Sequence, residues 1–449
     1  MEKNLTRGKI FPLLFSFLIP VVLGLLLQQV YSLADTAIVG RTLGVTALGG
    51  VGSTGSLSFL VIGFCNGLCS GFALPVAQAF GAEDCKRLRK YVTNSVYLSA
   101  AISLLLLALT LPFCDELLHA MGTPEEQYGY AYDYILVIFT GIPATLLYNL
   151  TANIIRSLGD SKTPVYFLGI SSVLNIACDL IAIKVLGWGV SGAAWATVFS
   201  QLVSGILCVF YMKKKYAVLR MESDDWKPEA EACRYLISNG VPMGLQFSIT
   251  AIGGVFVQSA VNKLGSLYVS ANTASHKLNQ FLMVPYSAQL TSSATFTGQN
   301  LGAREFDRIR KGLFINFLIG AIFWAAELLL LFSVGDRLFL IFLSGKDYEM
   351  IRKPAMEILT IQTLGFCLLI PVNVARPAIQ GMSHARLALF AGIIEMLSRV
   401  FVSLYAIPVI GYPGIGLAPV TAWLFADLFL VPAFFICLQK ERKKAEAIS

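Results

Sequence analysis

A carboxylic acid lies inside the first long apolar stretch of the chain. Residues 10–40 are almost all apolar, enough for a helix to cross a hydrocarbon core of roughly 30 Å at about 1.5 Å per residue. Gln28, Ser32 and Asp35 follow helical spacing and share one face of this predicted helix. An ionised aspartate there costs about 2.5–3.5 kcal/mol on insertion scales. Asp35 therefore indicates either a proton- or cation-driven step or a buried structural contact with another helix.

Pro20 interrupts the same predicted helix. Proline has no N–H group for the carbonyl one turn earlier, so the helix can bend at this point. We predict that Pro20 is a hinge and that the segment carrying Asp35 moves about it.

A second acid and three polar side chains reach the depth of Asp35 from other predicted spans. At 1.5 Å per residue, their positions along these spans place all of them in the outer half of the membrane. Carboxylates with amide and hydroxyl oxygens favour a proton or a small hard cation. The alternative is a polar network that only fixes helix packing. The predicted coupling residues are Asp35, Asp179, Asn175, Thr197 and Tyr134. Of these, Asp35, Asn175, Asp179 and Thr197 are the candidate ligands of such a cation, which is H⁺ or Na⁺ in the family resemblance given below.

The composition is that of a polytopic membrane protein. Of 449 residues, 56% are hydrophobic and only 14% are charged, far from the composition of soluble proteins. The net charge of +7 does not indicate nucleic-acid binding, because the basic residues lie in short loops between apolar segments. We find no convergent nucleophile or metal cluster, so we do not predict an enzyme, and no cofactor is expected. Twelve spans are predicted, at residues 10–39, 47–80, 92–112, 128–150, 163–186, 191–212, 236–262, 270–300, 312–334, 354–375, 386–408 and 414–438.

Lysine and arginine predict the orientation of these spans. They concentrate in alternate loops, in the N-terminal segment and in the C-terminal tail, so both termini are predicted to be cytoplasmic. One long charged linker falls at the midpoint of the chain. The predicted domains are an N-terminal lobe at 1–212, this cytoplasmic linker at 213–235 and a C-terminal lobe at 236–449.

The two halves repeat each other. QAFGAEDCKRLRK at 78–90 returns as QNLGAREFDRIRK at 299–311, displaced by 221 residues, and Pro20 is matched by Pro242. Six predicted spans separate the two copies, so both lie on the same membrane side and the repeat is parallel. Two six-helix lobes of this kind form a secondary transporter. The repeated loop is interpreted as a cytoplasmic turn with a basic anchor, or else as a gate.

The polar set is not repeated in the second half. The repeat register places Val257 opposite Asp35 and Phe401 opposite Asp179. Glu395 and Arg399 lie one turn apart, and we interpret them as an internal ion pair. Two further acids of this half, Glu327 and Asp427, are left without a predicted role.

The twelve spans, the 6+6 repeat, the Gln-x-x-Gly-Ala loops and the Pro20-to-Asp35 helix together resemble the multidrug and toxic compound extrusion (MATE) family, of the MOP superfamily. The resemblance covers nearly the whole chain. The set Asn175-x-x-x-Asp179 with Thr197, Tyr134 and Asp35 is similar to the N-lobe cation site of the bacterial DinF/MepA-like branch, and Asn153 is similar to another polar position of that lobe. The NorM-like branch has acids in its C-lobe cavity, whereas Gln246 near the equivalent region is neutral.

The resemblance implies an all-α fold and an antiporter. Cationic or amphipathic drugs would leave by alternating access as H⁺ or Na⁺ enters, and Gln28, Ser32 and Gln246 are candidate substrate contacts. It further implies a functional monomer, in contact with lipids, in a bacterial plasma membrane. A flippase for a lipid-linked precursor shares the superfamily architecture, but it would need a cationic cavity for a pyrophosphate head group. The sequence does not distinguish H⁺ from Na⁺ and does not name the drugs.

Overall fold

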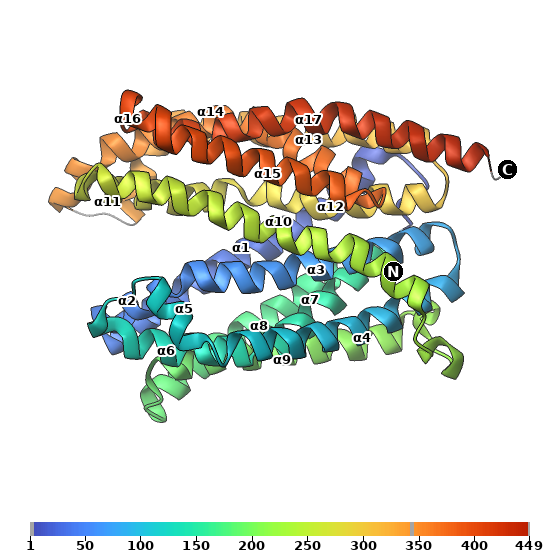
Figure 1. Cartoon of the computed structure of the whole chain (residues 1–449), viewed down its shortest axis with the longest axis horizontal. Helices are drawn as coiled ribbons and strands as arrows, with labels where there is room; N and C mark the ends of the chain where they lie inside the picture. The colour runs from blue at the N-terminus through green and yellow to red at the C-terminus, as the bar shows by residue number, and fades with distance from the viewer. Residues whose placement is uncertain (1–3, 342–344, 448–449) are drawn as a thin grey trace. The chain divides into compact units, whose positions relative to one another are not determined.

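The computed structural model describes residues 4–341 and 345–447, and these residues are almost entirely helical (Figure 1). The first half of the chain contains α1 (Ile10–Leu43), α2 (Val45–Ser53), α3 (Gly55–Gly81), α4 (Cys85–Thr110), α5 (Cys114–Ala120), α6 (Glu125–Thr140), α7 (Ile142–Ser157), α8 (Lys162–Leu180), η1 (Ile181–Val185) and α9 (Gly189–Lys215). The second half contains α10 (Ala230–Lys263), α11 (Ser266–Leu282), α12 (Val284–Gly302), α13 (Phe306–Leu338), η4 (Phe339–Ile341), α14 (Gly345–Gly381), α15 (Ala385–Phe401), η5 (Val402–Ala406), α16 (Ile407–Ile410) and α17 (Pro413–Glu446). Between the halves lie two short 3-10 turns, η2 (Ala217–Leu219) and η3 (Ser223–Trp226).

All twelve predicted spans coincide with helices. Within the described residues, ten helices are long and apolar enough to cross a membrane, and α6 with α7 forms an eleventh span that bends by 49° at Gly141. The predicted span at 270–300 is α11 followed by α12, with a break at Met283. Its many Ser, Thr, Asn and Gln residues keep it below the hydropathy of the others.

The helices form two compact units. The first contains residues 19–248, and the second contains residues 5–18 together with the chain from Ile249 onward. In the second unit, α14 and α17 lie side by side (Figure 1). Two long helices therefore change unit along their length: α1 next to Pro20, and α10 just before Ile249.

The backbone repeats as the sequence does. Glu83 and Arg304, each following the Gly-Ala of a repeated loop, both have φ of +58°. The next residue's N–H then bonds back to the end of the helix, Asp84 to Ala79 and Glu305 to Asn300, closing the turn as in a Schellman motif. The π-helical segments η1 and η5 are also 221 residues apart. The parallel repeat predicted from the sequence is therefore present at the level of turn geometry.

Each repeated loop binds the segment that leads into a long helix. Gln299 accepts a hydrogen bond from the N–H of Leu5 (2.8 Å), and the guanidinium of Arg308 donates to the carbonyls of Leu5 and Gly8 at 3.0 and 2.9 Å. In the first copy, Gln78 accepts a bond from the hydroxyl of Tyr235 on α10 (2.8 Å). These loops are thus turns that also hold the first turns of α1 and α10.

The segment between the halves is folded onto α4. Asp225 is buried and pairs with Arg89 (2.7 Å), and its carbonyl accepts a bond from the Thr93 hydroxyl (2.7 Å). Asn94 accepts from the N–H of Glu229 (3.0 Å). The predicted linker is therefore a docked strap, with α10 beginning inside it at Ala230.

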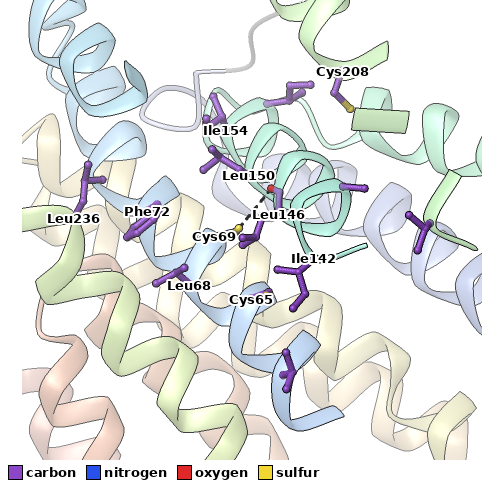
Figure 2. Close-up of a cluster of buried hydrophobic side chains, with 14 of the residues drawn as sticks. Cys65, Leu68, Cys69, Phe72, Ile142, Leu146, Leu150, Ile154, Cys208 and Leu236 are labelled. Carbon is purple, nitrogen blue, oxygen red and sulfur yellow. Dashed lines mark hydrogen bonds between the residues drawn. The ribbon is translucent and has the colours of Figure 1, made fainter. Parts of the chain in front are cut away.

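The core of the first unit places α7 against α3. Figure 2 shows apolar side chains of α3 facing those of α7, and the thiol of Cys69 lies 3.8 Å from the carbonyl oxygen of Leu146. All nine cysteines are free thiols. This packing fixes which face of α7 turns away from α3. The labelled core residues are Cys65, Leu68, Cys69, Phe72, Ile142, Leu146, Leu150, Ile154, Cys208 and Leu236.

Candidate functional site

The two acids of the first unit face each other. The side chains of Asp35 on α1 and Asp179 on α8 come within hydrogen-bonding range. Asp179 is fully buried, and neither of its carboxylate oxygens has a donor among the described residues. Two unit charges 4 Å apart repel by about 4 kcal/mol at an effective dielectric of 20. A shared proton or a bound cation between the two carboxylates would relieve this repulsion.

Asn175 and Thr197 complete a set of oxygen acceptors beside the acids. Asn175 lies one turn before Asp179 on α8, and its amide donates to the hydroxyl of Thr197 on α9 (3.4 Å). This bond turns the amide oxygen of Asn175 the other way, where it is buried without a donor. Oxygens of Asp35, Asn175 and Asp179 thus lack donors together, and such a set suits a proton or a hard cation.

Tyrosines surround the acid pair. Tyr134 on α6, predicted from the sequence, lies within electrostatic range of Asp35 and Asp179. Tyr31 lies near Tyr134 and Asp35, and Gln28 lies one turn earlier on α1. Sequence reasoning missed Tyr31, although it lies one turn before Asp35 on the polar face. The π-helix η1 begins two residues after Asp179, and π segments often occur at functional sites.

The other predicted residues lie apart from this pair. Asn153 on α7 accepts a hydrogen bond from Arg156 (3.3 Å), and no described contact joins it to either acid. Gln28 and Ser32 are exposed on the face of α1 that carries Asp35, whereas Gln246 is half-buried on α10. Pro20 lies inside α1, which the structure forms as one continuous helix.

The second unit contains a separate ionic cluster. Glu395 and Arg399 pair at 3.7 Å, which confirms the predicted internal ion pair. Glu395 also pairs closely with Arg376 on α14, a residue that sequence reasoning did not connect to it. Asp427 on α17 lies within electrostatic range of Arg376. Two acids and two arginines thus balance in charge, which is typical of a network that holds helices together.

Glu327 lies outside this ionic cluster. Its carboxylate accepts a hydrogen bond from the buried hydroxyl of Tyr286 (2.6 Å).

A Gln side chain in place of Glu327 still offers an oxygen to Tyr286. We therefore expect Glu327→Gln to retain at least half of the wild-type transport rate, and Asp427→Asn to lower it less than Asp179→Asn does. Initial efflux rates at matched membrane levels measure this. An inactive Glu327→Gln with an active Asp179→Asn would place the driving site in the second unit.

The chain is similar to known proteins over most of its length. The family model described as MatE matches residues 20–181 and 242–405, one copy in each half. The chain is 30% identical over 344 residues to the probable multidrug resistance protein YoeA of Bacillus subtilis, covering 74% of this chain and 73% of that protein. It is 24% identical over 277 residues to the multidrug export protein MepA of Staphylococcus haemolyticus, covering 61% of each.

A solved structure has the same fold. It is described as the outward-facing conformation of a multidrug resistance MATE family transporter of the MOP superfamily, with a TM-score of 0.91, 22% identity and 98% coverage of both chains. The chain is therefore a multi-pass membrane transporter with an all-α fold. It belongs to the MATE family of multidrug efflux transporters.

Proposed function

We propose that this transporter is a cation-coupled antiporter that exports cationic or amphipathic small molecules by alternating access. The observation that carries the proposal is the Asp35–Asp179 pair, two carboxyl groups in contact without a donor between them. An entering H⁺ supplies that donor. An entering Na⁺ would instead be held by the same two carboxylates with the oxygens of Asn175 and Thr197.

Export follows from competition for this pair. A cationic substrate neutralises the acids when they are ionised, and an entering ion displaces it by doing the same. Each charge that crosses a potential of 100 mV contributes about 2.3 kcal/mol, which is enough to shift a two-state equilibrium of similar size. The names of YoeA and MepA as multidrug proteins support the choice of drug-like cargo. We place the protein in a bacterial plasma membrane, as a monomer with both termini cytoplasmic.

Transport by purified protein in liposomes tests the proposal. A fluorescent organic cation should accumulate only when an H⁺ or a Na⁺ gradient is imposed, and applying each gradient alone identifies the driving ion. Dye movement that is independent of both gradients would reject antiport. A flippase remains the alternative, and it would move a lipid-linked oligosaccharide in the same liposomes instead of the cation.

A further inference from the structure

A polar row runs along α7 in the first unit. Thr145, Asn149, Asn153 and Arg156 recur every three or four residues and so lie along one side of the helix. Near the start of the row, Thr145 donates to Gln201 of α9 (2.6 Å), and at its end Arg156 donates to Asn153 (3.3 Å). α7 thus carries polar groups along its whole length and ends in a cation.

The guanidinium of Arg156 points back along α7 and away from the loop that follows. It donates to the amide oxygen of Asn153 one turn earlier (3.3 Å), and it lies within electrostatic range of Tyr148 and of Cys208 on α9. Its Nε atom is buried and has no acceptor among the described residues. Arg156 lies in the last turn of α7, where a residue that only set the orientation of the spans would point into water.

Arg156 has no counter-ion among the residues that the structure describes. No described carboxylate lies within 4 Å of it, and the nearest acid in sequence, Asp160, is occupied elsewhere. The carboxylate of Asp160 accepts bonds from the N–H groups of Lys162 and Thr163 (3.0 Å each) and from the hydroxyl of Tyr216 (2.8 Å). A partly buried cation without a counter-ion is costly, so it is either stabilised by a ligand or retained for one.

Tyr31 connects this cation to the acid pair. It lies within electrostatic range of Tyr148, which is itself within electrostatic range of Arg156, and it also lies near Tyr134 and Asp35. Tyr148 and Arg156 are eight residues apart on α7, so their backbones are separated by about 12 Å along the helix at 1.5 Å per residue. The first unit thus holds two acids without donors, Asp35 and Asp179, near Tyr31 and Tyr134. It also holds Arg156, which has no described counter-ion, near Tyr148.

We propose that Arg156, with Tyr148 and Asn153, forms a subsite for an anionic group, so that the first unit binds zwitterionic organic substrates end to end. The inference rests on the proposed function, in which the acid pair receives the positive end. The guanidinium and the phenol donate to the carboxylate of the ligand. The rings of the half-buried Tyr31, Tyr134 and Tyr148 contact its apolar body. Arg156 is then a residue that determines specificity, not one that couples the ion.

Two dyes that differ in one group test the subsite. Rhodamine 6G is a cationic ester, and rhodamine 19 is the same dye with the ester replaced by a free carboxylate, hence a zwitterion. Uptake of each into liposomes containing the full-length protein is measured as kcat/KM under the driving gradient. The variants are Arg156→Gln, Arg156→Lys and, as a control, Lys162→Gln, which removes a positive charge from an exposed position nearby.

We expect Arg156→Gln to lower kcat/KM for rhodamine 19 roughly tenfold or more, the usual effect of losing a hydrogen bond to a charged group. The same variant should change the value for rhodamine 6G less than about twofold. Arg156→Lys should recover part of the rhodamine 19 activity, and Lys162→Gln should alter neither dye.

Equal losses for both dyes in Arg156→Gln, with no recovery in Arg156→Lys, would assign Arg156 to folding and reject the subsite. Unchanged transport of both dyes would reject it as well. A wild type that moves rhodamine 6G but not rhodamine 19 leaves export intact and rejects the zwitterion site. A wild type that moves neither dye under either gradient contradicts the proposed function itself.

Discussion

Asp35→Asn and Asp179→Asn should each reduce gradient-driven efflux to the level of empty liposomes. An asparagine amide donates to the remaining carboxylate, so each variant imitates a pair that is permanently protonated and can no longer exchange its ion. Removing a buried charge should not impair insertion, since an aspartate in a membrane helix costs about 2.5–3.5 kcal/mol. Because the acids act as a unit, the double variant should be no less active than either single one.

The measurement compares initial efflux rates with the amount of folded protein recovered from the membrane. Asp133→Asn is the matched control, because Asp133 is an exposed acid on α6 and lies in the same unit. Normal transport by both single variants at normal expression would remove the acid pair from the mechanism. Reduced transport in Asp133→Asn would show that the loss reflects surface charge.

Pro20→Ala should lower the turnover rate several-fold while changing the apparent affinity for substrate much less. A proline inside a helix costs about 3 kcal/mol relative to alanine, so the substitution stabilises a straight α1 by a similar amount. This is comparable to the roughly 2.3 kcal/mol that one charge contributes per 100 mV. Pro20 lies where α1 passes from one compact unit to the other, which is where a bend would have the largest effect.

Spin labels near the C-terminal end of α1 and at the end of η1, which follows α8, test the bend directly. Ala37 and Val185 are exposed positions for the labels, after the two exposed native cysteines, Cys85 and Cys367, have been replaced by serine. We expect the distance between the labels to change with pH in the wild type and to remain fixed in Pro20→Ala. Pro143→Ala, at an exposed helix start where proline breaks no hydrogen bond, should behave as the wild type does. If the distance between the labels in the wild type does not change with pH, Asp35 is a static ligand of the ion and α1 does not bend.

The sequence by itself determined the features that depend only on position along the chain. Apolar segments have to match the membrane thickness, so the ten or eleven spans that the described residues form could be located, and the repeated loops with Glu83 and Arg304 follow from local turn chemistry. Depth along a helix is proportional to residue number. For this reason Asp35, Asp179, Asn175 and Thr197 could be brought to one level before any contact was known.

Only the tertiary structure decided where side chains point and which helices are neighbours. Arg156 lies in the last turn of α7, next to a loop, yet the packing of α7 turns its guanidinium back along the helix toward Tyr148. Glu395 was paired with Arg399 from helical spacing, but its closer partner Arg376 lies on another helix that no sequence rule places beside it. The segment between the halves is a charged linker by its sequence. In the structure it is docked, because its buried acid, Asp225, pairs with Arg89 of α4. Charge neutralisation between distant segments depends on how the helices pack, and spacing along the chain does not contain that information.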